Sequence, residues 1–148
     1  RIAVIGEGEW MFSHEAMAEE PTAEPFMPEE YRYLIVPDVA LQKARVAIAA
    51  LKPHASIWSN NGYAFMRELP ERTLPGRVYA IESIEPYHPK SLKRELRGLG
   101  VEIMKRDTPL SVDAVRRSLG VKAGGDVLLA LTMIQSKNWI IRLKPLSL

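Results

Sequence analysis

The part of the sequence that decides the fold is residues 101–134, which read VEIMKRDTPLSVDAVRRSLGVKAGGDVLLALTMI. The run from Val101 to Arg106 predicts a strand. Ser111 is a good N-cap for a helix, and Gly120 is placed to end that helix in a left-handed conformation. The almost wholly apolar run from Val127 to Ile134 is typical of a central strand covered on both faces. The stretch therefore predicts a strand, a helix and a second strand.

The flanking residues extend this unit on both sides. Arg77 to Glu85 is a β-rich run, and Pro89 suits the first turn of a helix that continues to about Arg97. Trp139 to Leu143 predicts a last strand, joined to the previous one by a short turn. The order β-α-β-α-β-β predicts right-handed crossovers and a mainly parallel sheet, with an antiparallel edge at the closing hairpin.

The first half of the chain begins with a predicted hairpin and an acidic loop. Residues 2–6 and 9–13 are short apolar and aromatic runs on either side of Gly6-Glu7-Gly8, which supplies a turn. Residues 14–30 combine three prolines with many glutamates and predict a loop.

A strand, a helix and two short strands follow. Tyr31 to Val36 is strand-like, and Asp38 is a suitable N-cap for the helix after it. The helix has one apolar stripe, formed by Leu41, Ala44, Ile48 and Leu51. Pro53 ends it, and residues 55–58 and 63–67 predict the short strands.

The length and the proline pattern together indicate two small domains. The chain has 148 residues, which allows one ordinary domain or two very small ones. Residues 68–76 contain two prolines and are typical of a boundary. We therefore expect one domain at residues 1–73 and a second domain at residues 74–148. The overall fold class is mixed, α+β with α/β-type crossovers.

Composition excludes several kinds of chemistry. The chain contains no cysteine, which removes disulfides, thiolate zinc sites and cysteine nucleophiles and favours a reducing compartment such as the cytoplasm. Its apolar runs are shorter than the ~20 residues that a membrane-spanning helix needs. The chain opens at Arg1, inside an apolar run, so we expect it to be part of a longer protein.

Charge is unevenly distributed along the chain. Residues 1–30 carry one basic and eight acidic side chains, a net charge of −7, whereas residues 31–148 carry a net charge of +9. This asymmetry fits a basic, nucleic-acid-binding body behind an acidic segment. It also fits an acidic loop and a basic surface that are merely solvated, which composition alone slightly favours.

No catalytic, cofactor-binding or metal site is predicted within the chain. Gly6-Glu7-Gly8 lacks the third glycine and the following helix of a nucleotide loop, and its glutamates would repel a pyrophosphate. Ser13-His14-Glu15 has the residue types of a triad, but adjacency in sequence does not make one. The histidines His14, His54 and His88 lie far apart, without the spacing of metal ligands.

The best local signal is the basic predicted helix at residues 89–97. Four cations form one stripe on it, opposite the leucines that would face the core. Such a stripe fits phosphate binding, and it equally fits a solvated helix face. The candidate nucleic-acid-binding residues are Lys90, Lys93, Arg94, Arg97, Lys105, Arg106, Arg116, Arg117 and Lys122. Arg116 and Arg117 also suit the C-terminal end of their own helix.

The second half of the chain resembles a known family. Residues 105–119 read KRDTPLSVDAVRRSL, and Gly-Gly-Asp at residues 124–126 precedes an apolar strand. These motifs resemble the THUMP-like domain at the C-terminus of bacterial class I S-adenosylmethionine-dependent methyltransferases. The segment from Tyr33 to Asp38 and the helix after it resemble the small ferredoxin-like domain that precedes this module in the same proteins.

The resemblance implies a function for a larger parent protein. That parent would be a methyltransferase whose S-adenosylmethionine site lies in an upstream domain outside this sequence. This chain would be a non-catalytic part that positions a structured RNA through its basic surface. The alternative is a structural module that packs on the catalytic domain or on another copy. An enzymatic activity of this chain alone has no supporting motif.

Overall fold

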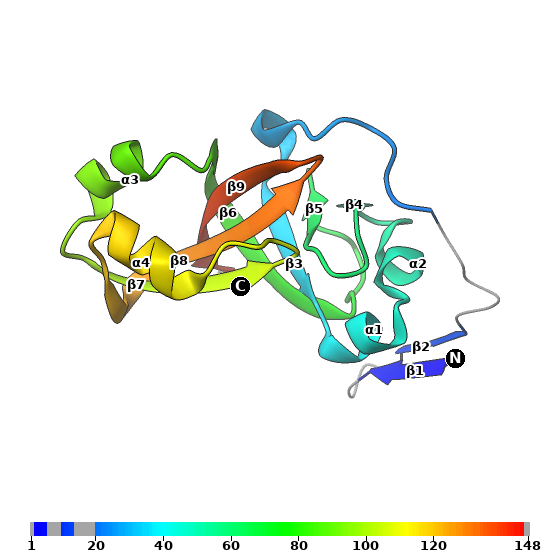
Figure 1. Ribbon diagram of the computed structural model, residues 1–148. Helices are drawn as coiled ribbons and strands as arrows, with labels where there is room; N and C mark the ends of the chain where they lie inside the picture. Colours follow the sequence, from blue (N-terminus) through cyan, green and yellow to red (C-terminus); the bar gives the residue numbers. More distant parts are fainter. Residues whose placement is uncertain (1, 6–9, 14–19, 147–148) are drawn as a thin grey trace. The chain divides into compact units, whose positions relative to one another are not determined.

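The computed structural model describes residues 2–5, 10–13 and 20–146 of the chain. Its helices and strands divide into two compact units, a first unit of Arg1–Ala80 with Leu146–Leu148 and a second unit of Ile81–Pro145. Both units combine helices with sheet strands, which confirms the predicted mixed fold class (Figure 1). The proposed division into domains at residue 73 stays a prediction.

The second unit has the predicted order of elements. Its strands and helices are β6 (Gly76–Pro86), α3 (Pro89–Leu96), β7 (Gly100–Arg106), α4 (Val112–Leu119), β8 (Lys122–Ile134) and β9 (Lys137–Pro145). The first residues of β6 belong to the first unit, where they pair with the strand β3 (Tyr33–Pro37). The order β-α-β-α-β-β is therefore confirmed.

The predicted mainly parallel sheet is wrong. Of the described pairings, only that of β7 with β8 is parallel, while β8 and β9 pair antiparallel, as do the strands of the first unit. The strand order β6-β9-β8-β7 also places the closing strand β9 between two others, so it is not an edge. The reason is topological: α4 joins neighbouring parallel strands, whereas α3 joins β6 and β7, which have β9 and β8 between them.

Local chemistry explains why α3 and α4 form where they do. Pro89 occupies the first turn of α3, as predicted, since that position needs no N–H donor. The Ser111 side chain accepts a hydrogen bond from the Ala114 N–H at 3.2 Å at the start of α4. Gly120 ends α4 with a φ of 65°, in the left-handed region. The predicted caps of α4 are thus confirmed.

The core of the second unit lies between α3, α4 and one face of the sheet. It consists of Leu92, Leu96, Val101, Val115, Leu119, Leu129, Leu131 and Ile140. The leucines of α3 and the apolar residues of α4 each recur at helical spacing, so each helix buries one stripe and leaves its other face in solvent. Burying a side chain of this size stabilises the fold by about 1.5–3 kcal/mol.

The first unit begins with an antiparallel hairpin of β1 (Ile2–Ile5) and β2 (Trp10–Ser13), as predicted. The turn expected between them lies outside the described residues, as does the start of the acidic loop at residues 14–19. The later strands of this unit pair in the antiparallel order β4-β5-β3-β6. Its remaining elements are η1 (Pro28–Glu30), β3 (Tyr33–Pro37), α1 (Val39–Ala44), α2 (Ala47–Leu51), β4 (Ser56–Ile57) and β5 (Ala64–Met66).

The helix predicted after Asp38 is interrupted. Arg45 has a φ of 58° and separates α1 from α2, and Asp38 makes no side-chain capping hydrogen bond. The apolar stripe is nevertheless used, because Leu41, Ile48 and Leu51 are buried together. A left-handed residue between two short helices lets both present the stripe to the same core.

The described part of the acidic segment is held against β4. The Thr22 N–H donates to the carbonyl of Ile57 and the Ile57 N–H donates to Thr22 Oγ1, both at 2.8 Å. The indole of Trp58 donates to the carbonyl of Glu24 at 3.0 Å. These bonds satisfy backbone groups at the edge of the sheet, which an exposed edge strand would leave open.

Candidate nucleic-acid interface

The structure places the predicted basic stripe on the outer face of α3. The side chains of Lys90, Lys93, Arg94 and Arg97 are exposed, while Leu92 on the opposite side is only 6% exposed. The leucine stripe fixes this orientation, because rotating the helix would expose apolar area to water. The four cations therefore face solvent along one helix.

The C-terminal end of α4 lies beside this stripe (Figure 1). The Gly98 N–H donates to the carbonyl of Gly120 at 2.8 Å. A Cβ placed at Gly120 would lie 3.4 Å from Arg97 Cγ and 3.7 Å from Lys93 Cε, so these side chains extend over the helix end. Because the last carbonyls of a helix carry partial negative charge, this position stabilises both cations.

Arg116 is committed to the backbone and differs from its neighbours. Its Nη1 donates to the carbonyl of Val101 at 2.6 Å and to the carbonyl of Lys122 at 3.2 Å. It thereby ties α4 to the starts of β7 and β8, and its side chain is only partly exposed. Arg117, the next residue, is exposed. Of this arginine pair, Arg117 is the one available to a ligand.

The cations at the end of β7 do not join the stripe. The Lys105 Nζ donates to the carbonyl of Leu110 at 2.8 Å and so holds the loop before α4. Arg106 pairs in register with Thr132 and points to the face of the sheet away from α3 and α4, because successive residues of a strand alternate. Lys122 is exposed, at the start of β8. The structure thus brings together the cations of α3 with Arg117 and leaves Lys105 and Arg106 apart.

A hollow of about 660 Å³ lies beside the first turns of α3. It is lined by His88, Pro89, Lys90, Ser91, Lys93 and Ser118. Ser118 comes from α4 and is hydrogen bonded to Tyr87, whose pKa is raised by burial and partly lowered again by this bond. Among the described residues that line it, cations and hydroxyls are present and carboxylates are absent. The hollow therefore has the chemistry of an anion site.

Sequence reasoning missed Ser118 and considered His88 as a metal ligand, for which its spacing is unsuitable. His88 occupies the N-cap position of α3, but its side chain makes no capping hydrogen bond. Ser118 has no motif of its own, and its place beside Lys90 depends on how α3 packs against α4. No local pattern in the sequence carries that information.

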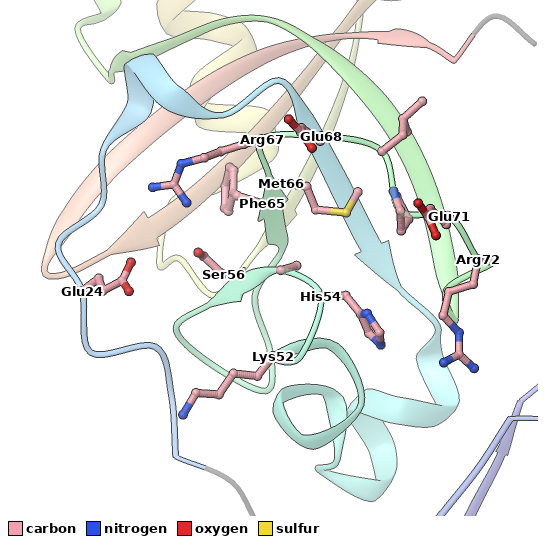
Figure 2. Close-up of a pocket in the computed structure, with 13 residues that line it drawn as sticks. Glu24, Lys52, His54, Ser56, Phe65, Met66, Arg67, Glu68, Glu71 and Arg72 are labelled. Carbon is pink, nitrogen blue, oxygen red and sulfur yellow. The ribbon is translucent and has the colours of Figure 1, made fainter.

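A larger hollow of about 1050 Å³ lies in the first unit (Figure 2). Figure 2 shows both carboxylates and cations around it, with Met66 and Phe65 among the residues that line it. Arg67 forms an ion pair with Glu30 at 3.4 Å, and the hydrogen bond and charge of that carboxylate raise the pKa of Arg67. Glu24, Glu68 and Glu71 on the same rim would repel a polyanion. This hollow is the weaker candidate for nucleic acid.

The described residues contain neither a metal-binding cluster nor a membrane-spanning helix. Within residues 2–5, 10–13 and 20–146, no group of three or more His, Asp or Glu side chains could hold a metal ion. In the same residues, every helix is too short or too polar to cross a membrane.

The second half of the chain is similar to a known family, and nearly the whole chain is similar in fold to a solved structure. Residues 76–145 match the family described as THUMP domain-like. The fold is similar to that of a protein from Porphyromonas gingivalis W83, solved as a "putative methyltransferase", with a TM-score of 0.72 at 22% sequence identity. The match covers 93% of this chain and 35% of that one, so this chain spans about a third of the length of the other protein. No curated protein matches the chain.

Proposed function

We propose that residues 76–145 hold a structured RNA for a methyltransferase of which this chain is a non-catalytic part. The THUMP-like match supports the RNA partner, because THUMP domains dock modifying enzymes on structured RNA. The fold shared with a longer protein described as a methyltransferase supports the parent activity. S-adenosylmethionine would be held elsewhere in that parent, since this sequence has no Gly-rich cofactor loop.

The exposed cationic face of α3 is the observation that carries the proposal. The second unit has twelve basic and seven acidic side chains, a net charge of +5. Five of its exposed cations lie on α3 and at the end of α4, on a surface fixed by the core beneath. A fixed array of cations attracts the phosphate backbone and releases counterions from it. Such contacts position an RNA without reading its sequence.

Salt dependence tests the proposal directly. We would titrate the chain into fluorescently labelled transfer RNA at 50 mM and 200 mM salt and follow anisotropy. If four cations contact phosphates, the dissociation constant should rise about 50- to 150-fold between the two conditions. Absence of binding, or binding that is indifferent to salt, would contradict the proposal.

Matched variants locate the binding surface. Arg94→Ala with Arg117→Ala removes two exposed cations from the proposed face and should lower the salt slope by about 2. Lys43→Ala with Lys144→Ala removes the same charge from exposed positions elsewhere and should leave the slope unchanged. Equal effects of the two double variants would favour the alternative, a module that packs on the catalytic domain or on another copy.

A further inference from the structure

We infer that the hollow beside α3 binds a phosphomonoester, the dianionic group that ends a phosphorylated RNA strand or a free nucleotide. The RNA source of this ligand rests on the proposed function, whereas the hollow's preference for the group itself does not. The inference names what this particular site takes, beyond the general attraction of the basic face for phosphodiesters.

Charge is the first argument. Lys90 and Lys93 give the hollow a charge of +2, and no carboxylate is among the described residues that line it. The larger hollow in the first unit has three glutamates around its rim and lacks this property. A phosphomonoester carries about −1.5 to −2 near pH 7, whereas an internal phosphodiester carries one negative charge. Two ammonium groups therefore match the terminal group better.

Hydrogen-bond donors are the second argument. Ser91 from α3 and Ser118 from α4 add hydroxyls on two sides of the hollow, and His88 lines it near the start of α3. A phosphomonoester offers three strong acceptor oxygens, one more than an internal phosphodiester has free. Lys90, Lys93 and Ser91 can donate to different oxygens of the same group, beside the Ser118 hydroxyl that is bonded to Tyr87.

Rigidity is the third argument. Ser118 is hydrogen bonded to Tyr87, and Leu92 of α3 packs in one core with Leu119 of α4. The backbone bond from Gly98 to Gly120 fixes the two helix ends as well. Side chains carried on two helices that are already packed together require less backbone ordering on binding than side chains on mobile loops.

Size is the fourth argument. The volume of about 660 Å³ lies within the 300–1,000 Å³ typical of small-molecule sites and exceeds what a phosphate group alone would fill. It leaves room for the nucleoside that carries the phosphate. A strand that runs across the exposed face of α3 presents internal phosphates to Arg94, whereas a terminal phosphate with its nucleoside can also occupy the hollow beside Lys90.

The test compares three ten-nucleotide RNAs of one sequence, with a 5′-phosphate, with a 3′-phosphate and with hydroxyls at both ends. Binding to the whole chain is measured by anisotropy through an internal label. We expect at least one phosphorylated strand to bind about tenfold more tightly than the hydroxyl-ended strand, as a charge-assisted hydrogen bond or two would give. Equal affinities of all three strands would overturn the inference and leave the general RNA role standing.

Paired variants separate the hollow from the rest of the basic face. Lys90→Gln with Lys93→Gln should reduce the preference for the phosphorylated strand to less than about twofold. Arg94→Gln with Arg117→Gln removes the same charge from α3 and α4 outside the hollow. This pair should weaken the binding of all three RNA strands and keep the preference for the phosphorylated strand. Loss of the preference in the second pair alone would contradict the site.

A nucleoside 5′-monophosphate distinguishes the two sources of the ligand. In an amide NMR titration, we expect the monophosphate to shift the signals of Lys90, Lys93 and Ser118, and the nucleoside alone to leave them in place. Shifts from the monophosphate without binding of any RNA strand would support the hollow and overturn the RNA proposal. Identical shifts from the nucleoside would contradict a site built for the phosphate.

Discussion

At the scale of single residues, neighbouring cations on one helix have different roles. Arg116 holds the backbone carbonyls of Val101 and Lys122, whereas Arg117 projects into solvent. The difference arises because residues one position apart on a helix point about 100° apart, so only one of the two faces the strands. Basic residues in a sequence therefore overstate the charge available to a ligand.

Arg116→Ala should destabilise the fold without a matching loss of RNA affinity. The substitution removes one part-buried and one exposed hydrogen bond from a charged donor, so we expect the free energy of unfolding to fall by about 1.5–3 kcal/mol. Arg117→Ala, the matched control, should change it by less than about 0.5 kcal/mol. Urea unfolding of both variants measures the difference. Equal destabilisation would show that the contacts of Arg116 contribute nothing.

Tyr87 should make the fold sensitive to alkaline pH. Burial raises the pKa of its hydroxyl above the ordinary value of 10, so the neutral form is favoured in the folded state. The stabilisation that comes from this shift is complete below the pKa of Tyr87 in the unfolded chain. It is lost as the pH rises through the higher pKa of Tyr87 in the folded protein. We expect urea midpoints to fall above about pH 10, and to fall less steeply in Tyr87→Phe. An identical decline in both proteins would exclude Tyr87 as a contributor.

At the scale of elements, β8 begins with an irregular glycine pair. Gly124 and Gly125 have φ values of 80° and 93°, and the pairing of β7 with β8 shifts register between Gly100 and Val101. A Cβ on Gly125 would lie 2.5 Å from the carbonyl oxygen of Gly100, a distance that real Cβ atoms do not show. The Gly-Gly-Asp motif is thus explained by close approach of two strands at a bulge.

Gly125→Ala should therefore destabilise the second unit more than an alanine at another left-handed glycine. Gly98 has a φ of 82°, but a Cβ there would meet nothing within 4 Å. Gly98→Ala carries only the conformational cost of about 1–2 kcal/mol. Gly125→Ala carries that cost and the clash with backbone, so its thermal midpoint should be lower than that of Gly98→Ala. The reverse order would contradict the bulge.

At the scale of the whole molecule, charge is separated along the sequence. The first 30 residues carry −7 and the remaining residues carry +9, within a net charge of only +2. Because the Debye length is about 10 Å at 0.1 M salt, the acidic segment influences an approaching polyanion mainly at low ionic strength. We expect the negative charge of this segment to slow the association of the chain with RNA by long-range repulsion.

Neutralising part of this segment should strengthen RNA binding at low salt only. Glu15→Gln, Glu19→Gln and Glu20→Gln together raise the net charge from +2 to +5. We expect the association rate with transfer RNA to rise roughly threefold at 50 mM salt and to match the parent chain at 300 mM. Stopped-flow fluorescence measures both rates. An increase that persists at 300 mM would indicate direct contact between the segment and the RNA.

The sequence by itself determined the kinds of elements and many of their ends. The order β-α-β-α-β-β, the caps at Ser111 and Gly120 and the buried leucines of α3 all follow from interactions between residues a few positions apart. Such local preferences are expressed wherever the segment lies in the fold. The interruption at Arg45 escaped notice because an apolar stripe is compatible with one helix or with two.

Only the tertiary structure decided which strands are neighbours and which polar groups meet. It placed β9 inside the sheet, bound Arg116 to two carbonyls and brought Ser118 of α4 to the hollow beside Lys90 of α3. Each of these results joins residues that are distant in sequence. Their contacts depend on how the apolar faces of whole helices and strands pack, and no short motif records that packing.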